Sequence, residues 1–157
     1  DHRDLHSFPT RRSSDLRLLA IRRLELRKKL LSSKREILRQ LAESLKDRIQ
    51  GDPALYKEFI EKAVRSGVKT GSEEIAVSRR DRELFNNEFM RHLNLIASEM
   101  IGGEPSLRLA DDEMDIEGGV YLRHGRENFN ASVTVSVESA VNELEPELAV
   151  ILFGGEN

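Results

Sequence analysis

The chain has 157 residues, of which 38% are hydrophobic and 34% charged, so it can form one modest core beside a solvated extension. It contains no cysteine, which excludes disulfides and thiolate chemistry, and its apolar runs are too short to span a membrane. The net charge of −3 conceals an asymmetry: residues 17–50 hold 11 basic and 4 acidic residues, whereas residues 51–157 hold 11 basic and 21 acidic ones. This contrast indicates two bodies with different surroundings. No secretory signal is visible, so we expect a cytoplasmic protein without direct membrane insertion.

Residues 1–16, which read DHRDLHSFPTRRSSDL, show neither a helical nor a strand period and contain Pro9. The segment back-translates codon by codon, in one frame, to a widely used DNA-sequencing adapter. We therefore predict that residues 1–16 are an artefactual, disordered segment, and the alternative is a disordered basic tail. On this interpretation the biological reading frame begins near Arg17, and the natural N-terminus is missing.

Residues 17–50 contain no glycine or proline and are rich in strong helix formers, which predicts one long helix. Leucines recur every seven residues, as in the seam of a coiled coil: Leu24, Leu31, Leu38 and Leu45. An eleven-residue repeat, such as Leu19, Leu30 and Leu41, fits equally well, so the handedness of a supercoil stays open. Either repeat requires a partner helix, and we expect this segment to be a stalk.

A compact head domain is predicted over residues 51–157. Asp52 and Pro53 are typical of a helix start, and the apolar spacing from Leu55 predicts a helix that stops at Gly67. Residues 74–78 are expected to form a strand. A second helix, interrupted near residues 86–87, should then end at Gly102.

The remaining part of the head is expected to supply further strands and a last helix. Residues 106–110 and 120–124 are predicted strands, and a return strand near residues 128–129 follows a turn at Gly125. Residues 133–137 alternate as in a strand, but valines and leucines also share one helical face, and we favour a helix capped by Ser132 and restarted near Pro146. Its face toward the sheet should carry Val137, Val141, Leu144, Leu148 and Leu152, with Phe153 closing the core.

Sites for chemistry are not apparent in this sequence. The acidic run at 111–115 lacks the glycine and the distal glutamate of a calcium loop, and His92 and His124 have no second ligand in sequence reach. No phosphate-binding glycine loop is present. We therefore expect no catalytic residue, no cofactor and no metal. Two alternatives remain, a coiled-coil protein that binds nucleic acid through the basic helix and a small enzyme with an unrecognised site.

Three segments resemble the E subunits of V-type and archaeal-type rotary ATPases, and they occur in that family's order. SRRDREL at 78–84 is similar to the segment between a strand and a helix, DIEGGVYL at 115–122 resembles the entry to a hairpin, and LEPELAVILFG at 144–154 resembles the C-terminal helix. The resemblance covers about two thirds of the chain, and residues 17–50 match by type only.

The resemblance implies a non-catalytic peripheral-stalk subunit that tethers the catalytic head against the torque of the rotor during proton or sodium transport. The implied partners are a helical stalk subunit called G or H, the catalytic A and B subunits, and membrane-proximal stalk or stator subunits, with no nucleic acid. The leucine seam would bind the stalk partner, and Glu143 and Glu147 are candidate contacts of the head with the catalytic subunits.

Overall fold

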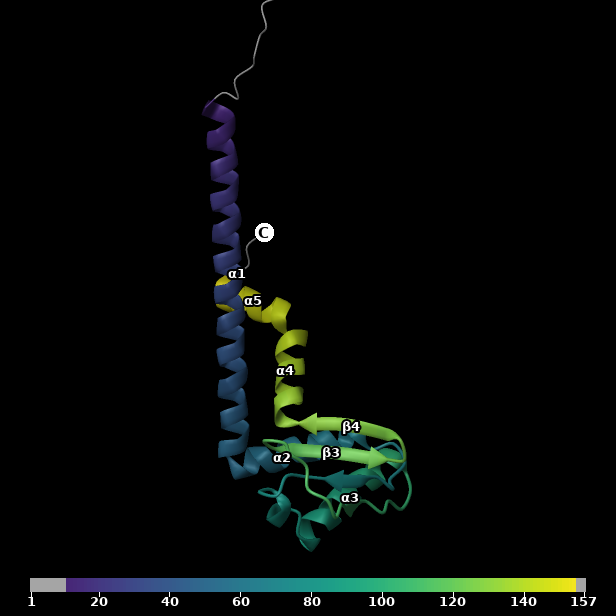
Figure 1. The fold of residues 1–157 in the computed structure, drawn as a ribbon. Helices are drawn as coiled ribbons and strands as arrows, with labels where there is room; N and C mark the ends of the chain where they lie inside the picture. Colours follow the sequence, from purple (N-terminus) through teal and green to yellow (C-terminus); the bar gives the residue numbers. More distant parts are fainter. Residues whose placement is uncertain (1–10, 155–157) are drawn as a thin grey trace, which may run out of the picture. The chain divides into compact units, whose positions relative to one another are not determined.

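The computed structural model describes residues 11–154 and confirms the predicted α+β class, in which one long helix precedes a small domain with a four-stranded sheet (Figure 1). In chain order the elements are α1 (Arg11–Gly51), α2 (Pro53–Gly67), β1 (Glu74–Ala76), the short 3-10 helix η1 (Arg82–Leu84), α3 (Asn87–Ile101), β2 (Arg108–Leu109), β3 (Gly119–His124), β4 (Glu127–Ser132), α4 (Val133–Glu143) and α5 (Glu145–Phe153).

Helix α1 begins at Arg11, before the expected start at Arg17. Residues 11–16, which we expected to be disordered, are therefore helical, whereas residues 1–10 lie outside the described part of the chain. The physical reason is that no proline or glycine occurs between Arg11 and Gln50, so nothing stops the helix from extending toward Pro9. The conformation of residues 11–16 does not test where this segment comes from.

The contacts between Cα atoms divide the chain after Gln40, so that the compact unit begins at Leu41 rather than at the predicted residue 51. The last turns of α1 belong to this unit because their side chains are buried there. Ala42 is 6% exposed and Lys46 is 8% exposed, and the Nζ atom of Lys46 lies 3.4 Å from a carboxylate oxygen of Glu138 on α4. The end of α1 is thus part of the compact unit as well as of the long helix.

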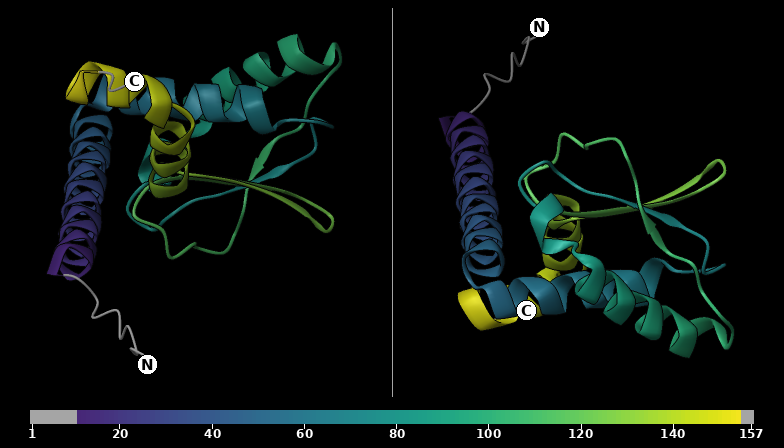
Figure 2. Two further views of the ribbon diagram at one scale, coloured as in Figure 1. Left: turned by 90° about the horizontal axis from the view of Figure 1, so that it is seen from above. Right: turned by 90° about the horizontal axis from the view of Figure 1, so that it is seen from below.

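The start of α2 forms as its sequence predicts. The carboxylate of Asp52 accepts hydrogen bonds from the backbone N–H groups of Ala54 and Leu55, and Pro53 occupies the first turn. Helices α2 and α3 lie side by side on one face of the sheet (Figure 2). The predicted interruption before α3 is also present, because the side chain of Asn86 caps the N–H of Phe89.

The sheet has the strand order β2-β1-β3-β4. Strands β1 and β2 are parallel, and β3 runs antiparallel to both β1 and β4. Ile75 on β1 lies opposite Leu122 on β3, which in turn lies opposite Phe129 on β4. Strand β4 spans six residues and is longer than the short return strand that we predicted. The largest side chains that are fully buried around this sheet are Ile60, Ile75, Leu93, Leu122, Val64, Val77, Val120 and Val133.

The C-terminal helix is broken at Leu144, just before Pro146, as predicted. Ser132 caps α4, and the valines Val133, Val137 and Val141 are buried. The expectation for α5 is wrong, because none of its residues is buried and Phe153 does not close the core. Apolar periodicity continued through the break, but the proline starts a new helix with its own direction, so the valine face of α4 does not extend into α5.

Candidate functional site

Three of the four leucines in the candidate coiled-coil seam of α1 are exposed, and the fourth is buried. Leu24 is 54% exposed, Leu31 is 48% exposed and Leu45 is 37% exposed. Leu38 is only 9% exposed, and it lies on the same helical face as the buried Ala42 and Lys46, at spacings of four residues. The exposed leucines could therefore contact another chain, whereas Leu38 is not accessible to one in this structure.

The part of α1 up to Gln40 carries many more exposed apolar side chains than the seam alone. They are Leu16, Leu18, Leu19, Ile21, Leu26, Leu30 and Ile37, each at least 42% exposed. Leu16, Leu19, Ala20 and Leu24 line an open groove of about 470 Å³ together with Arg23 and Arg27. An apolar stripe with arginines beside it favours a partner helix that carries apolar and acidic side chains.

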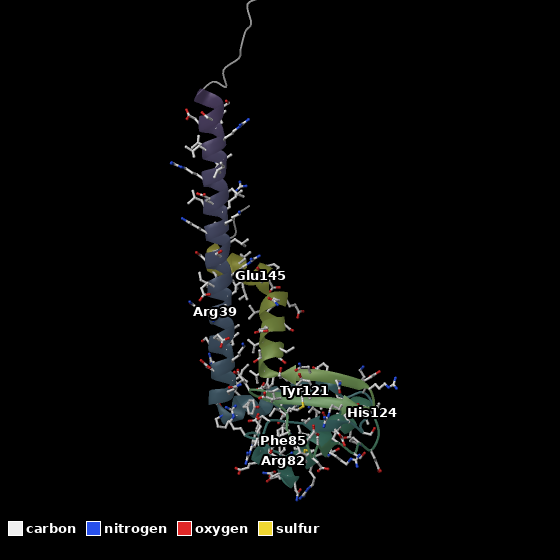
Figure 3. All side chains as sticks on the ribbon, in the orientation of Figure 1. Arg39, Arg82, Phe85, Tyr121, His124 and Glu145 are labelled. Atoms are coloured by element: carbon white, nitrogen blue, oxygen red, sulfur yellow. The ribbon has the colours of Figure 1, made fainter. Side chains whose placement is uncertain are left out.

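Polar side chains of this helix interact locally. The guanidinium of Arg39 and the amide of Gln40 donate to the carboxylate of Glu36 at 2.7 to 3.1 Å, and these hydrogen bonds lower the pKa of Glu36 to about 2. The groups are solvent-exposed, so they support the helix only weakly. Figure 3 shows the side chain of Arg39 on α1. Residues 13–40 contain no buried polar cluster that could perform chemistry.

The acidic residues near the C-terminus lie on the surface. Glu143 and Glu147 are both exposed, as expected for residues that meet a partner. Helix α5, which starts at Glu145 (Figure 3), adds a strongly apolar surface, since Val150 is 60% exposed and Ile151 is 77% exposed. Leu148, Ala149 and Phe153 are half-buried, so α5 has one partly packed side and one open apolar side that another chain could cover.

The acidic run at 111–115 takes part in an ion pair with β3. Arg123 forms a two-pronged ion pair with Asp112, and this hydrogen bonding lowers the pKa of Asp112. No group of three or more His, Asp or Glu side chains within residues 11–154 could hold a metal ion. None of the helices in the same range is long and apolar enough to cross a bilayer.

The two histidines are separate. His92 lies 2.9 Å from a carboxylate oxygen of Glu61, beside an open groove between α2 and α3 of about 300 Å³. His124 lies at the hairpin end of β3 (Figure 3), where its Nδ1 atom is 3.3 Å from the hydroxyl of Ser72. Neither arrangement joins a nucleophile, a base and an orienting group in a buried pocket, which a hydrolytic site would need.

Two of the segments that resemble E subunits, SRRDREL and DIEGGVYL, meet at a buried tyrosine, and this contact was not predicted from the sequence. The hydroxyl of Tyr56 donates to the carboxylate of Asp81, from the SRRDREL segment, at 2.7 Å. The same hydroxyl accepts from the N–H of Gly119, from the DIEGGVYL segment, at 2.7 Å. Asp81 and Tyr56 are 7% and 8% exposed. The one indication of this contact in the sequence was Tyr56 itself, because a tyrosine that is buried on an apolar helix face needs a hydrogen-bond partner for its hydroxyl.

Comparisons with known proteins find relatives of one kind. The E subunit of the V-type proton ATPase of Clostridium botulinum (strain Loch Maree) is 29% identical over 138 residues, which cover 87% of this chain and 69% of that protein. The E subunit of the V-type ATP synthase of Acetivibrio thermocellus is 29% identical over 98 residues, and that of the V-type proton ATPase of Thermoanaerobacter pseudethanolicus is 26% identical over 102 residues. The second and third matches cover 62% and 65% of this chain. They cover 49% and 50% of the two relatives, so the chain spans about half the length of each. No protein-family profile matches the chain.

Proposed function

This chain belongs to the family of V-type ATPase E subunits, and we propose that it is a non-catalytic peripheral-stalk subunit. In this role it tethers the catalytic A/B head against the torque of the rotor while ATP synthesis or hydrolysis is coupled to proton or sodium transport. It would work on the cytoplasmic face of the membrane, where it also contacts membrane-proximal stator subunits. The observation that carries the proposal is the exposed apolar surface of α1 between Leu18 and Ile37.

A helix of this length suits a mechanical role. Residues 17–51 of α1, which follow the segment expected to be artefactual, extend over roughly 50 Å at a rise of 1.5 Å per residue. Its exposed leucines would be costly in water unless another chain covered them. Partner contact through Leu24 and Leu31 is therefore the simplest account of this surface, and a helical G- or H-type stalk subunit is the proposed occupant.

The compact unit offers a second surface for the catalytic subunits. Residues 127–157 contain six glutamates and no lysine or arginine, and α5 exposes Val150 and Ile151. An apolar surface with uniformly negative charge beside it suits a partner surface that is apolar at its centre and basic at its edge. Glu143 and Glu147 remain the proposed contacts with the A/B head.

Copurification tests the stalk contact directly. The variant with both Leu24→Asp and Leu31→Asp should lose binding to a G-type subunit, because two charges would enter the apolar seam. The matched control is Leu95→Asp, which makes the same change at a leucine that is 65% exposed on α3. If the double variant bound its partner within about threefold of the unchanged chain, the seam assignment would be wrong.

A charge reversal tests the contact with the catalytic subunits. The variant with Glu143→Lys and Glu147→Lys should keep the thermal midpoint of the chain, because both side chains are exposed, yet bind the A/B hexamer less tightly. Unchanged binding to the hexamer would remove these glutamates from the interface. Binding of duplex DNA that falls steeply with salt would instead favour the nucleic-acid alternative.

A further inference from the structure

One short turn, Glu117–Gly119, is hydrogen-bonded to four different parts of the head. The carbonyl of Glu117 accepts from the side chains of Gln50, at 3.0 Å, and Arg80, at 2.9 Å. The carbonyl of Gly118 accepts from the N–H of Val133, the first residue of α4, at 3.0 Å, and the N–H of Gly119 donates to Tyr56. We propose that this turn is a mechanical joint that couples the last turn of α1 to α4, with Gln50 and Arg80 as its positioning residues.

The two glycines allow the backbone to pass close to its neighbours. A Cβ atom on Gly118 would lie 2.9 Å from the side-chain nitrogen of Gln50 and 3.1 Å from the hydroxyl of Tyr56. Gly119 has a φ of +89°, which side-chain-bearing residues rarely adopt, and a Cβ atom there would collide with the carbonyl oxygen of Ala131. At Gly119 the backbone angle and the close carbonyl together favour glycine, whereas at Gly118 a Cβ atom would displace the flexible end of Gln50 and so disturb its hydrogen bond to the turn.

The inner side of the turn is fixed by a buried network. The carboxylate of Asp81 accepts from the hydroxyl groups of Tyr56, at 2.7 Å, and Ser78, at 3.0 Å, and all three residues are at most 8% exposed. Burial raises the pKa of Tyr56 well above its usual value, so the hydroxyl remains protonated and can both donate and accept. The inner side of the turn is therefore rigid because its polar groups are satisfied.

The outer side of the turn reaches the surface, and this separates the joint from the core. Gln50 is half-buried and Arg80 is exposed, so shortening either side chain opens no cavity in the core. Arg80 also reaches the inner network, because its Nε atom lies 3.6 Å from the carboxylate of Asp81. The ion pair between Lys46 and Glu138 links α1 to α4 a second time. If the chain is a stalk subunit, as proposed above, a load on α1 passes through this joint into α4 and on to α5.

Hydrogen exchange of the full-length chain tests the joint without any partner. The variant with Gln50→Ala and Arg80→Ala leaves Gly119, Val133 and Leu122 unchanged in sequence. If the turn is such a joint, the amides of Gly119 and Val133 should exchange about tenfold faster in this variant. The amide of Leu122, in the centre of β3, should keep its exchange rate. Arg79→Ala is the matched control, since Arg79 is an exposed neighbour of Arg80, and it should change none of the three rates.

Two results of this experiment would contradict the proposal that the turn is a joint. Unchanged exchange at Gly119 and Val133 would show that Gln50 and Arg80 do not hold the turn. Equal acceleration at Leu122 would show that their loss weakens the whole core, so that the turn has no separate role. Because no other subunit is present, either result would leave the proposed stalk function untouched, and that function is tested by the copurification with a G-type subunit.

Discussion

The two regions of this chain differ in what keeps their apolar side chains out of water. In residues 41–154, leucines, valines and isoleucines from the helices and the sheet bury one another, and Ile60, Leu93 and Val133 are fully buried. In residues 13–40, nearly every leucine is at least 48% exposed, and Glu36 accepts hydrogen bonds from Arg39 and Gln40 along the same helix. The compact unit buries its apolar side chains within itself, whereas the long helix leaves most of its leucines exposed, as the proposed contact with a partner helix would require.

This difference assigns separate roles to side chains of the same kind. A buried leucine in the compact unit contributes to the free energy of unfolding, whereas on the proposed function an exposed leucine on α1 contributes to binding. Leu38 marks the transition, because it is 9% exposed although it lies on the same helix as Leu31, which is 48% exposed. Substitutions at matched residues in the two regions can therefore test this difference.

The largest effect is expected in the core of α3. Leu93 is fully buried, so Leu93→Ala should lower the free energy of unfolding by about 2–5 kcal/mol, measured by denaturant titration. Leu95→Ala is the control on the same helix, and because Leu95 is 65% exposed its cost should stay within about 0.5 kcal/mol. Equal losses for the two variants would contradict the assignment of this core.

A smaller loss is expected from the buried polar network. Tyr56→Phe removes a hydroxyl that both donates to Asp81 and accepts from Gly119, which leaves two buried groups without their partner. We expect a loss of about 1–3 kcal/mol in the free energy of unfolding. Tyr121→Phe is the control, because that half-buried hydroxyl only accepts from Asn130 and should cost less. The reverse order would show that Asp81 and Gly119 find other partners.

The pH dependence of stability should involve Glu73. Burial acts to raise the pKa of this carboxyl, but hydrogen bonds from Thr70 and Lys69 outweigh it, so the pKa in the folded state is lowered. Stability from Glu73 is then fully present above its pKa in the unfolded chain and is lost as the pH falls through the lower folded-state value.

The variant Glu73→Gln should therefore be less stable than the unchanged chain near neutral pH, and the difference should shrink as the pH falls below about 4. Urea titrations at several pH values measure this difference. Glu74→Gln, at the exposed neighbouring carboxylate, is the control and should show a smaller dependence. A difference for Glu73→Gln that stayed constant down to about pH 2 would contradict the role of its hydrogen bonds.

The smallest effect on stability is expected on the long helix. Leu31→Ala should change the free energy of unfolding of the isolated chain by no more than about 0.5 kcal/mol, because the side chain is 48% exposed. The same substitution should weaken binding to a helical partner. A loss above about 1 kcal/mol in the isolated chain would show that Leu31 is packed within the chain itself.

Most of the fold could be predicted from the sequence because its signals are local. Asp52-Pro53, Asn86 and Ser132 begin helices through contacts within three residues of themselves, and Gly102 ends one through its own backbone angle. Such caps act whatever the rest of the chain does. The break before α5 could be predicted from Pro146 for the same reason.

The remaining features depend on contacts between residues far apart in the sequence. Gln50 and Glu117 are 67 positions apart, and Tyr56 and Gly119 are 63 positions apart, so no periodicity could bring them together. The exposure of α5 could not be predicted either, because its leucines continue the period of α4 while the proline changes the direction of the helix. The low exposure of Leu38 could not be predicted either, because the heptad treats it in the same way as the exposed Leu31 and Leu45.

The central claim is that the region up to Gln40 depends on a partner chain and that the region from Leu41 does not. Amide hydrogen exchange of the full-length chain, alone and with a G-type stalk subunit, tests it directly. We expect residues 13–40 to exchange rapidly alone and at least about tenfold more slowly in the complex, while the amides of β3 keep the same slow rate in both. Slow exchange of residues 13–40 in the isolated chain, or no change on adding the partner, would contradict the account.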